Sequence, residues 1–134
     1  METLKRIFRD HPAPASDAGD EAYELVRATA ECAAACTACA DACLAEAAVV
    51  QLRDCIRSCL DCADLCAVTG RLLARPGEQD ADTLRAQLSA CETACRACAT
   101  LCAHHDGMAH CIACAEACRR CADACRGMRE AIVS

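Results

Sequence analysis

Cysteines recur along this chain at intervals of three and four residues, in four separate rows. The first three rows have the spacing four, three, four, and the fourth row begins with one additional three-residue step. The rows are Cys32, Cys36, Cys39 and Cys43; Cys55, Cys59, Cys62 and Cys66; Cys91, Cys95, Cys98 and Cys102; and Cys111, Cys114, Cys118, Cys121 and Cys125. This alternation places residues on one face of a helix that packs in a bundle. The rows therefore predict four helices whose cysteine faces converge on one axis.

Three breaks separate the rows. Residues 75–77 (Arg-Pro-Gly) form the clearest break, and Gly107 marks another. The remaining break contains neither Gly nor Pro. Cys43 and Cys55 lie twelve residues apart, which is about 120° out of register at about 100° per residue. A continuous helix would point the two rows in different directions, so we predict a tight turn near residues 46–50.

The rest of the sequence favours helix, because Ala, Leu, Arg, Glu and Gln dominate and there are only 5 Gly and 3 Pro. The predicted helices span roughly residues 17–46, 50–74, 79–104 and 108–131. Their short connections make neighbouring helices antiparallel. We therefore expect an all-α protein, an antiparallel up-down-up-down four-helix bundle with a Cys-lined core.

The start of the chain differs from the bundle. Pro12 and Pro14 exclude a long helix, so residues 1–15 are expected to form an N-terminal arm and residues 16–134 a single domain. Ser16 and Asp17 are candidate N-caps of the first long helix. Asp20 and Glu21 suit its first turn.

At one end of the predicted bundle the rows continue into ordinary core residues. These residues, here called the floor, are Leu25, Thr29, Thr69, Leu73, Leu84, Leu88, Met128 and Ile132. The opposite end, here called the mouth, collects the two remaining turns and holds His104, His105, Met108 and His110. The sequence thus predicts a closed apolar floor, a thiol-lined shaft and a mouth with histidine and methionine.

Thiols at this spacing favour binding of Cu(I). The Cβ atoms of residues i and i+4 on a helix lie about 5–6 Å apart, so the thiolates of two such cysteines can hold one ion between them. Soft thiolates suit Cu(I). One monovalent ion per thiolate also neutralises charges that would be costly in a dry interior. Zinc bound by four unshared thiolates would leave two negative charges per site, so zinc is disfavoured but not excluded.

Other interpretations remain open. The cysteines could fill the core as small hydrophobes, although Leu or Val would fill the space better. A disulfide scaffold would be richer in Gly and Pro. Iron–sulfur carriers usually take their cysteines from loops. A zinc or cadmium store, or a chaperone that delivers one or two copper ions, also fits the thiols.

Charge and hydropathy restrict the partners and the location. The net charge of −6 provides no basic surface for nucleic acid. No apolar stretch approaches the length of a membrane span, and the N-terminus lacks the apolar run of a secretory signal. We expect a cytoplasmic protein with no nucleic-acid or membrane partner.

The mouth supplies further candidate ligands. His104 and His110 lie close in sequence to Cys102 and Cys111, and Met108 offers a soft thioether. His105 is expected at the surface, and His11, beside Pro12, is expected to take no part.

The cysteine rows, the stretches at residues 40–44 (ADACL) and 52–57 (LRDCIR), and the His110–Cys111 pair together resemble the bacterial copper storage proteins, in particular their cytosolic branch. The resemblance implies a storage and detoxification protein, not an enzyme. It also implies a homotetramer that binds multiple Cu(I) ions per protomer, with all seventeen cysteines as ligands and His104 and His110 assisting at the mouth. Thr29, Cys59 and Met108 depart from the pattern of some relatives.

Overall fold

The computed structural model describes residues 1–12, 19–105 and 107–132, and throughout these residues the regular structure is helical. The predicted caps Ser16 and Asp17 lie outside the described residues. The elements in chain order are α1 (Glu2–Arg9), α2 (Gly19–Leu44), the short 3₁₀ helix η1 (Val49–Leu52), α3 (Arg53–Leu73), α4 (Ala81–Ala103) and α5 (Ala109–Ala131).

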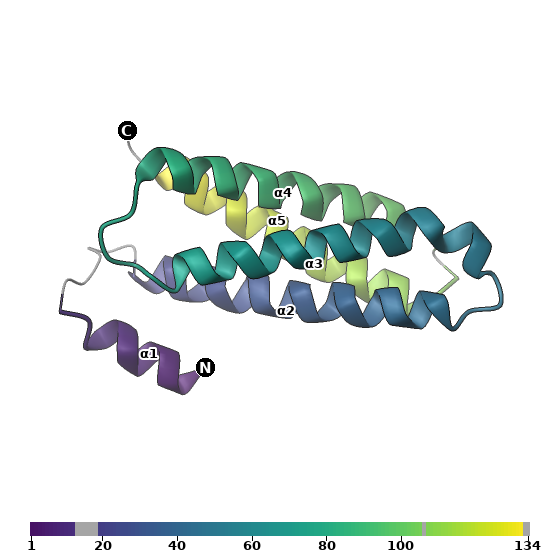
Figure 1. Ribbon diagram of the computed structural model, residues 1–134, viewed down its shortest axis with the longest axis horizontal. Coiled ribbons are helices and arrows are strands. Elements are labelled where there is room, and N and C mark those ends of the chain that lie inside the picture. The colour runs from purple at the N-terminus through teal and green to yellow at the C-terminus, as the bar shows by residue number, and fades with distance from the viewer. Residues whose placement is uncertain (13–18, 106, 133–134) are drawn as a thin grey trace.

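The four long helices form the predicted up-down-up-down bundle (Figure 1). Each long helix packs against the next one in the chain, and α5 closes the ring against α2. The turns between α2 and α3 and between α4 and α5 lie at one end of the bundle, and the α3–α4 connection lies at the other (Figure 1). This arrangement brings the four cysteine rows around one axis.

The break without Gly or Pro lies between α2 and α3, where the phase of the cysteine rows predicted it. Helix α2 ends at Leu44, and backbone bonds continue the turn, with Glu46 N donating to the carbonyl of Cys43 at 3.2 Å. The predicted start of the next helix at residue 50 is too early, because residues 49–52 form the 3₁₀ helix η1. The fully buried Leu52 anchors this segment to the core.

Two helix starts, those of α2 and α4, carry acidic residues that stabilise them. Asp20 and Glu21 occupy the first turn of α2, as predicted. Helix α4 begins later than predicted because Asp80 is its N-cap, whose side chain accepts a hydrogen bond from Thr83 N at 2.9 Å.

The N-terminal segment contains the short helix α1, which the sequence reading did not identify. Lys5 lies over the ring of Tyr23 in α2, 5.1 Å from its centroid. Leu4 and Phe8 pack in part against the core of the bundle. Apolar contacts and one cation–π contact thus hold α1 beside the start of α2.

The floor is closed as predicted: seven of its residues are buried, and Ile132 packs against them in part. Its two polar members satisfy their hydroxyls locally, since Thr29 donates to Leu25 O at 2.9 Å and Thr69 donates to Leu65 O at 2.7 Å. None of the described helices is both long and apolar enough to cross a membrane.

Candidate metal centre

All seventeen cysteines point into the bundle. Each is at most 2% exposed, and each is a free thiol. No cysteine row faces solvent, so the central geometric prediction from the sequence is confirmed. The sulfur atoms replace the large apolar side chains that normally fill the middle of such a bundle.

The closest sulfur neighbours belong to different helices. Cys55 and Cys102 approach to 3.2 Å between their Sγ atoms, and Cys36 and Cys118 approach to 3.5 Å. Pairs at i and i+4, which the sequence favoured as clamps, are more widely spaced, for example 3.9 Å for Cys32 and Cys36. The spacing within one row could not reveal contacts that form only when opposing rows meet.

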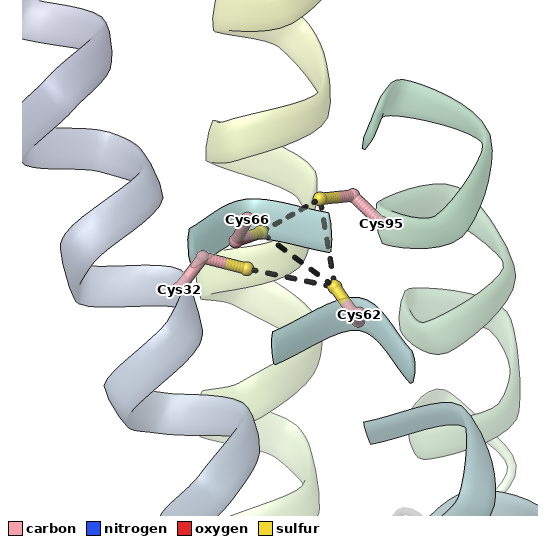
Figure 2. A group of neighbouring side chains, drawn as sticks. All are labelled: Cys32, Cys62, Cys66 and Cys95. Atoms are coloured by element: carbon pink, nitrogen blue, oxygen red, sulfur yellow. Dashed lines mark hydrogen bonds between the residues drawn. The ribbon is translucent and has the colours of Figure 1, made fainter. Parts of the chain in front are cut away.

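Figure 2 shows one such meeting point, formed by Cys32 of α2, Cys62 and Cys66 of α3, and Cys95 of α4. The Sγ atom of Cys62 lies 3.9 Å from that of Cys32, 3.9 Å from that of Cys66 and 3.6 Å from that of Cys95. Three helices therefore contribute ligands to a single small volume.

Groups of this kind overlap along the axis. In each group the candidate ligand atoms all lie within 4.8 Å of one another. Described groups are Cys32, Cys62, Cys66 and Cys95; Cys32, Cys36, Cys62 and Cys118; Cys36, Cys98, Cys114 and Cys118; Cys39, Cys59, Cys102 and Cys114; and Cys39, Cys43, His110 and Cys111. Because each group shares at least one thiol with the next, they form one connected sulfur path from near the floor to the mouth.

The last of these groups includes a histidine. His110 Nδ1 lies 3.5 Å from Cys39 Sγ and 3.6 Å from Cys111 Sγ, and Cys43 Sγ lies 3.9 Å from Cys111 Sγ. The other ring nitrogen of His110, Nε2, lies 3.4 Å from Glu46 Oε1. The contact with Cys39, and then that with Glu46, raises the pKa of His110 above its usual value.

The thiols at the mouth differ in acidity. Burial raises the pKa of Cys43 to about 12, and burial also raises the pKa of Cys111. Hydrogen bonds from neighbouring thiols, that of Cys102 first among them, lower the pKa of Cys39 to about 6. Cys39 lies directly beside His110, with its Sγ atom 3.5 Å from Nδ1.

The other candidate ligands belong to none of the groups given above. His104 is exposed at the C-cap of α4, and within the described residues its ring makes no hydrogen bond to a thiol. Met108 is partly buried and packs against the core. His105 is half-buried.

Sequence reasoning did not single out Glu46. The predicted break at residues 46–50 placed it at the mouth, but a carboxylate in a turn is ordinary. Its contact with His110 appears only when the α2–α3 turn is brought against the start of α5.

Comparisons with known proteins agree with this geometry. The family model described as "Copper storage protein" matches residues 18–130. The structure of the copper storage protein Ccsp from Streptomyces lividans, loaded with 10 copper equivalents, is 43% identical and has a TM-score of 0.92. The match covers 96% of this chain and 99% of that chain.

Two further structures match over most of the chain. A cytosolic copper storage protein from Streptomyces lividans with five coppers is 46% identical, with a TM-score of 0.83, over 85% of this chain and 96% of that chain. The Cu(I)-bound copper storage protein BsCsp3 is 34% identical, with a TM-score of 0.73, over 81% of this chain and 97% of that chain. A comparison with curated proteins finds no match.

Proposed function

The chain belongs to the copper storage protein family, and from this premise we propose that it stores and detoxifies copper in the cytosol by binding multiple Cu(I) ions per protomer inside the bundle. The observation that carries the proposal is the connected path of buried free thiols. A protein that only delivers copper needs one exchangeable site, whereas this interior is lined with thiols from near the floor to the mouth.

Charge supports a monovalent ion. Thiolates that lose their protons in a water-excluded interior need compensation, and Cu(I) supplies one positive charge per thiolate. A thiolate that belongs to two neighbouring groups can contact more than one ion. Such a continuous cluster suits the low coordination numbers of Cu(I).

Zinc is the second candidate, and one observation favours it. The four-thiol groups draw ligands from several helices and lie within 4.8 Å, which meets the ligand count of a tetrahedral zinc site. Isolated sites of that type would each leave two uncompensated negative charges, and the sharing of thiols between groups prevents several of them from filling independently. The storage of Cu(I) therefore remains the better proposal.

All seventeen cysteines and His110 are proposed as ligands, with His104 and Met108 as further ligands at the mouth once their side chains turn inward. Residues 16–134 are proposed to form the storage domain, following the arm at 1–15, and four protomers to form a homotetramer. We propose no catalytic role for the thiols, because the family is one of storage.

Anaerobic titration with Cu(I), followed by mass spectrometry under native conditions, tests the proposal. We expect a number of bound ions well above about four, the number that separate four-thiolate sites would hold. Uptake of about four Cu(I) ions or fewer, or saturation by zinc at a higher affinity than by Cu(I), would contradict it.

Replacing both His104 and His110 with Ala tests the assignment of the mouth. We expect slower transfer of Cu(I) from a chelator, with the total number of bound ions nearly unchanged, because the sulfur path remains intact. A collapse of capacity would show that the histidines hold the cluster together instead.

A further inference from the structure

Glu46 and His110 come together from different parts of the chain at the mouth. Glu46 lies in the turn after α2, and His110 lies in the first turn of α5. The imidazole ring stands between the carboxylate and the thiols, with Nε2 at 3.4 Å from Glu46 Oε1 and Nδ1 at 3.5 Å from Cys39 Sγ. Each ring nitrogen thus faces a different kind of partner.

The chemistry of these partners selects one form of the ring. A carboxylate only accepts hydrogen bonds, so the nitrogen that faces it carries the proton. In a neutral imidazole the other nitrogen then has a free lone pair. Glu46 therefore favours the tautomer with a proton on Nε2, and the lone pair of Nδ1 then accepts a hydrogen bond from the thiol of Cys39 or Cys111.

We propose that Glu46 is a positioning residue for copper uptake: it holds the ring of His110 with Nδ1 ready to accept a Cu(I) ion beside Cys39. This inference rests on the proposed function. Histidine ligands commonly donate their second nitrogen to a carboxylate, which fixes the ring and increases its basicity. In this tautomer the ion binds Nδ1 without loss of a proton from the imidazole, and the proton that leaves is that of the neighbouring thiol.

The local backbone holds Glu46 in place. Glu46 N donates to Cys43 O at 3.2 Å, and Glu46 O accepts from Val49 N at 3.2 Å. Its side chain is 39% exposed, so replacing it opens no cavity in the core. The variants Glu46→Ala and Glu46→Gln can therefore be compared with the original protein as folded bundles.

The first readout needs no copper. Long-range ¹H–¹⁵N correlations of the reduced, metal-free protein report which nitrogen of His110 carries the proton. We expect the Nε2–H tautomer in the original protein, a mixture of tautomers in Glu46→Ala, and substantial retention of Nε2–H in Glu46→Gln, whose side-chain oxygen still accepts a hydrogen bond. Asp54→Asn, at an exposed site in the first turn of α3, removes the same charge and should leave the tautomer unchanged.

The second readout is Cu(I) uptake from a competing chelator. We expect Glu46→Ala to weaken binding of the ion at the mouth about tenfold, with Glu46→Gln between the two and Asp54→Asn unchanged. Total capacity should stay constant in all three variants. An unchanged His110 tautomer in Glu46→Ala would overturn the inference, and so would an equal effect of Asp54→Asn on uptake.

The same experiments separate this inference from the storage proposal. If the original protein binds only about four ions, storage fails while the tautomer result stands by itself. If capacity is high in every variant but the tautomer of His110 does not respond to Glu46, storage stands and the positioning role fails.

Discussion

Glu92 shows how a single charged residue joins two helices of the bundle from the outside. Its side chain lies in α4, is 13% exposed, and accepts hydrogen bonds from Arg96 Nε at 3.0 Å and from Arg129 Nη2 of α5. Burial opposes ionisation, but the bonds from Arg129 and Arg96 outweigh it and hold the pKa of Glu92 below its usual value. The ionised carboxylate therefore stabilises the folded protein.

Replacing Glu92 with Gln should lower the free energy of unfolding of the reduced, metal-free protein by about 1.5–3 kcal/mol at neutral pH, the value of a hydrogen bond to a charged group. Because the folded pKa lies below the unfolded one, this contribution is complete above the unfolded pKa of about 4.3 and is lost as pH falls through the folded pKa. Urea unfolding at pH 7 and at a series of lower pH values measures how this contribution falls.

Glu130 provides the matched control, because it pairs with Arg126 at the surface, where both side chains are more than half exposed. Glu130→Gln should change the free energy of unfolding by less than about 0.5 kcal/mol. An equal loss in the two variants would contradict the special role of Glu92.

At the scale of the elements, Gly70 sets how closely α2 and α3 approach at the floor. A Cβ atom at this position would lie 2.9 Å from Thr29 Oγ1. The hydroxyl of Thr29 is already bonded to the carbonyls of its own helix, so it cannot move freely. The absence of a side chain at residue 70 thus permits the close contact.

Replacing Gly70 with Ala should lower the free energy of unfolding by about 1–3 kcal/mol, because the added methyl group overpacks the floor. Gly127→Ala in α5 is the control, since nothing lies within 4 Å of a Cβ there. This control should raise the free energy of unfolding by about 0.5–1 kcal/mol, since Ala favours helix over Gly. Denaturant unfolding measures both variants. If Gly70→Ala and Gly127→Ala change the free energy of unfolding equally, helix propensity and not packing determines the effect at residue 70.

The sequence predicted those elements that depend on periodicity. The spacing of the cysteines gave the four long helices, their inward faces and the closed floor, and the phase difference between Cys43 and Cys55 located the α2–α3 turn. It did not predict the short helix α1, whose contacts with Tyr23 depend on tertiary packing, nor the 3₁₀ helix η1. The spacing within each row does not specify how far one helix is shifted along the bundle axis relative to the next. The contacts between sulfurs of different helices depend on this shift, and so does the contact between Glu46 and His110.

In the whole molecule, the residues that stabilise the fold and the residues that bind ions lie in different parts of the bundle. Apolar residues such as Leu25, Leu73 and Leu88 are buried at the floor, and they stabilise the fold without metal. The shaft contributes smaller side chains, whose thiols can lose their protons and bind ions. Folding and loading are therefore separable.

The metal-free, reduced protein should retain its helical structure. Removing Cu(I) with a chelator should leave the far-ultraviolet circular dichroism nearly unchanged while the melting temperature falls, because the ions bind only the folded state. Loss of the helical signal on removal of copper would contradict a fold that the apolar floor stabilises without metal.

Loading should weaken as pH falls. Each thiol must release its proton before it binds an ion, and the raised pKa of Cys43, about 12, makes that release harder at the mouth. Competition titrations with a Cu(I) chelator between pH 8 and pH 5 should give steadily lower affinities. An affinity independent of pH would contradict binding by thiols that start protonated.

The closed floor also restricts the route by which stored ions enter and leave the bundle. Leucines and threonine hydroxyls bonded to their own helices seal one end of the sulfur path, so this end offers an ion no exit. In the proposed store, ions therefore enter and leave by the mouth alone, and an ion bound near the floor can leave only by passing along the whole row of thiols.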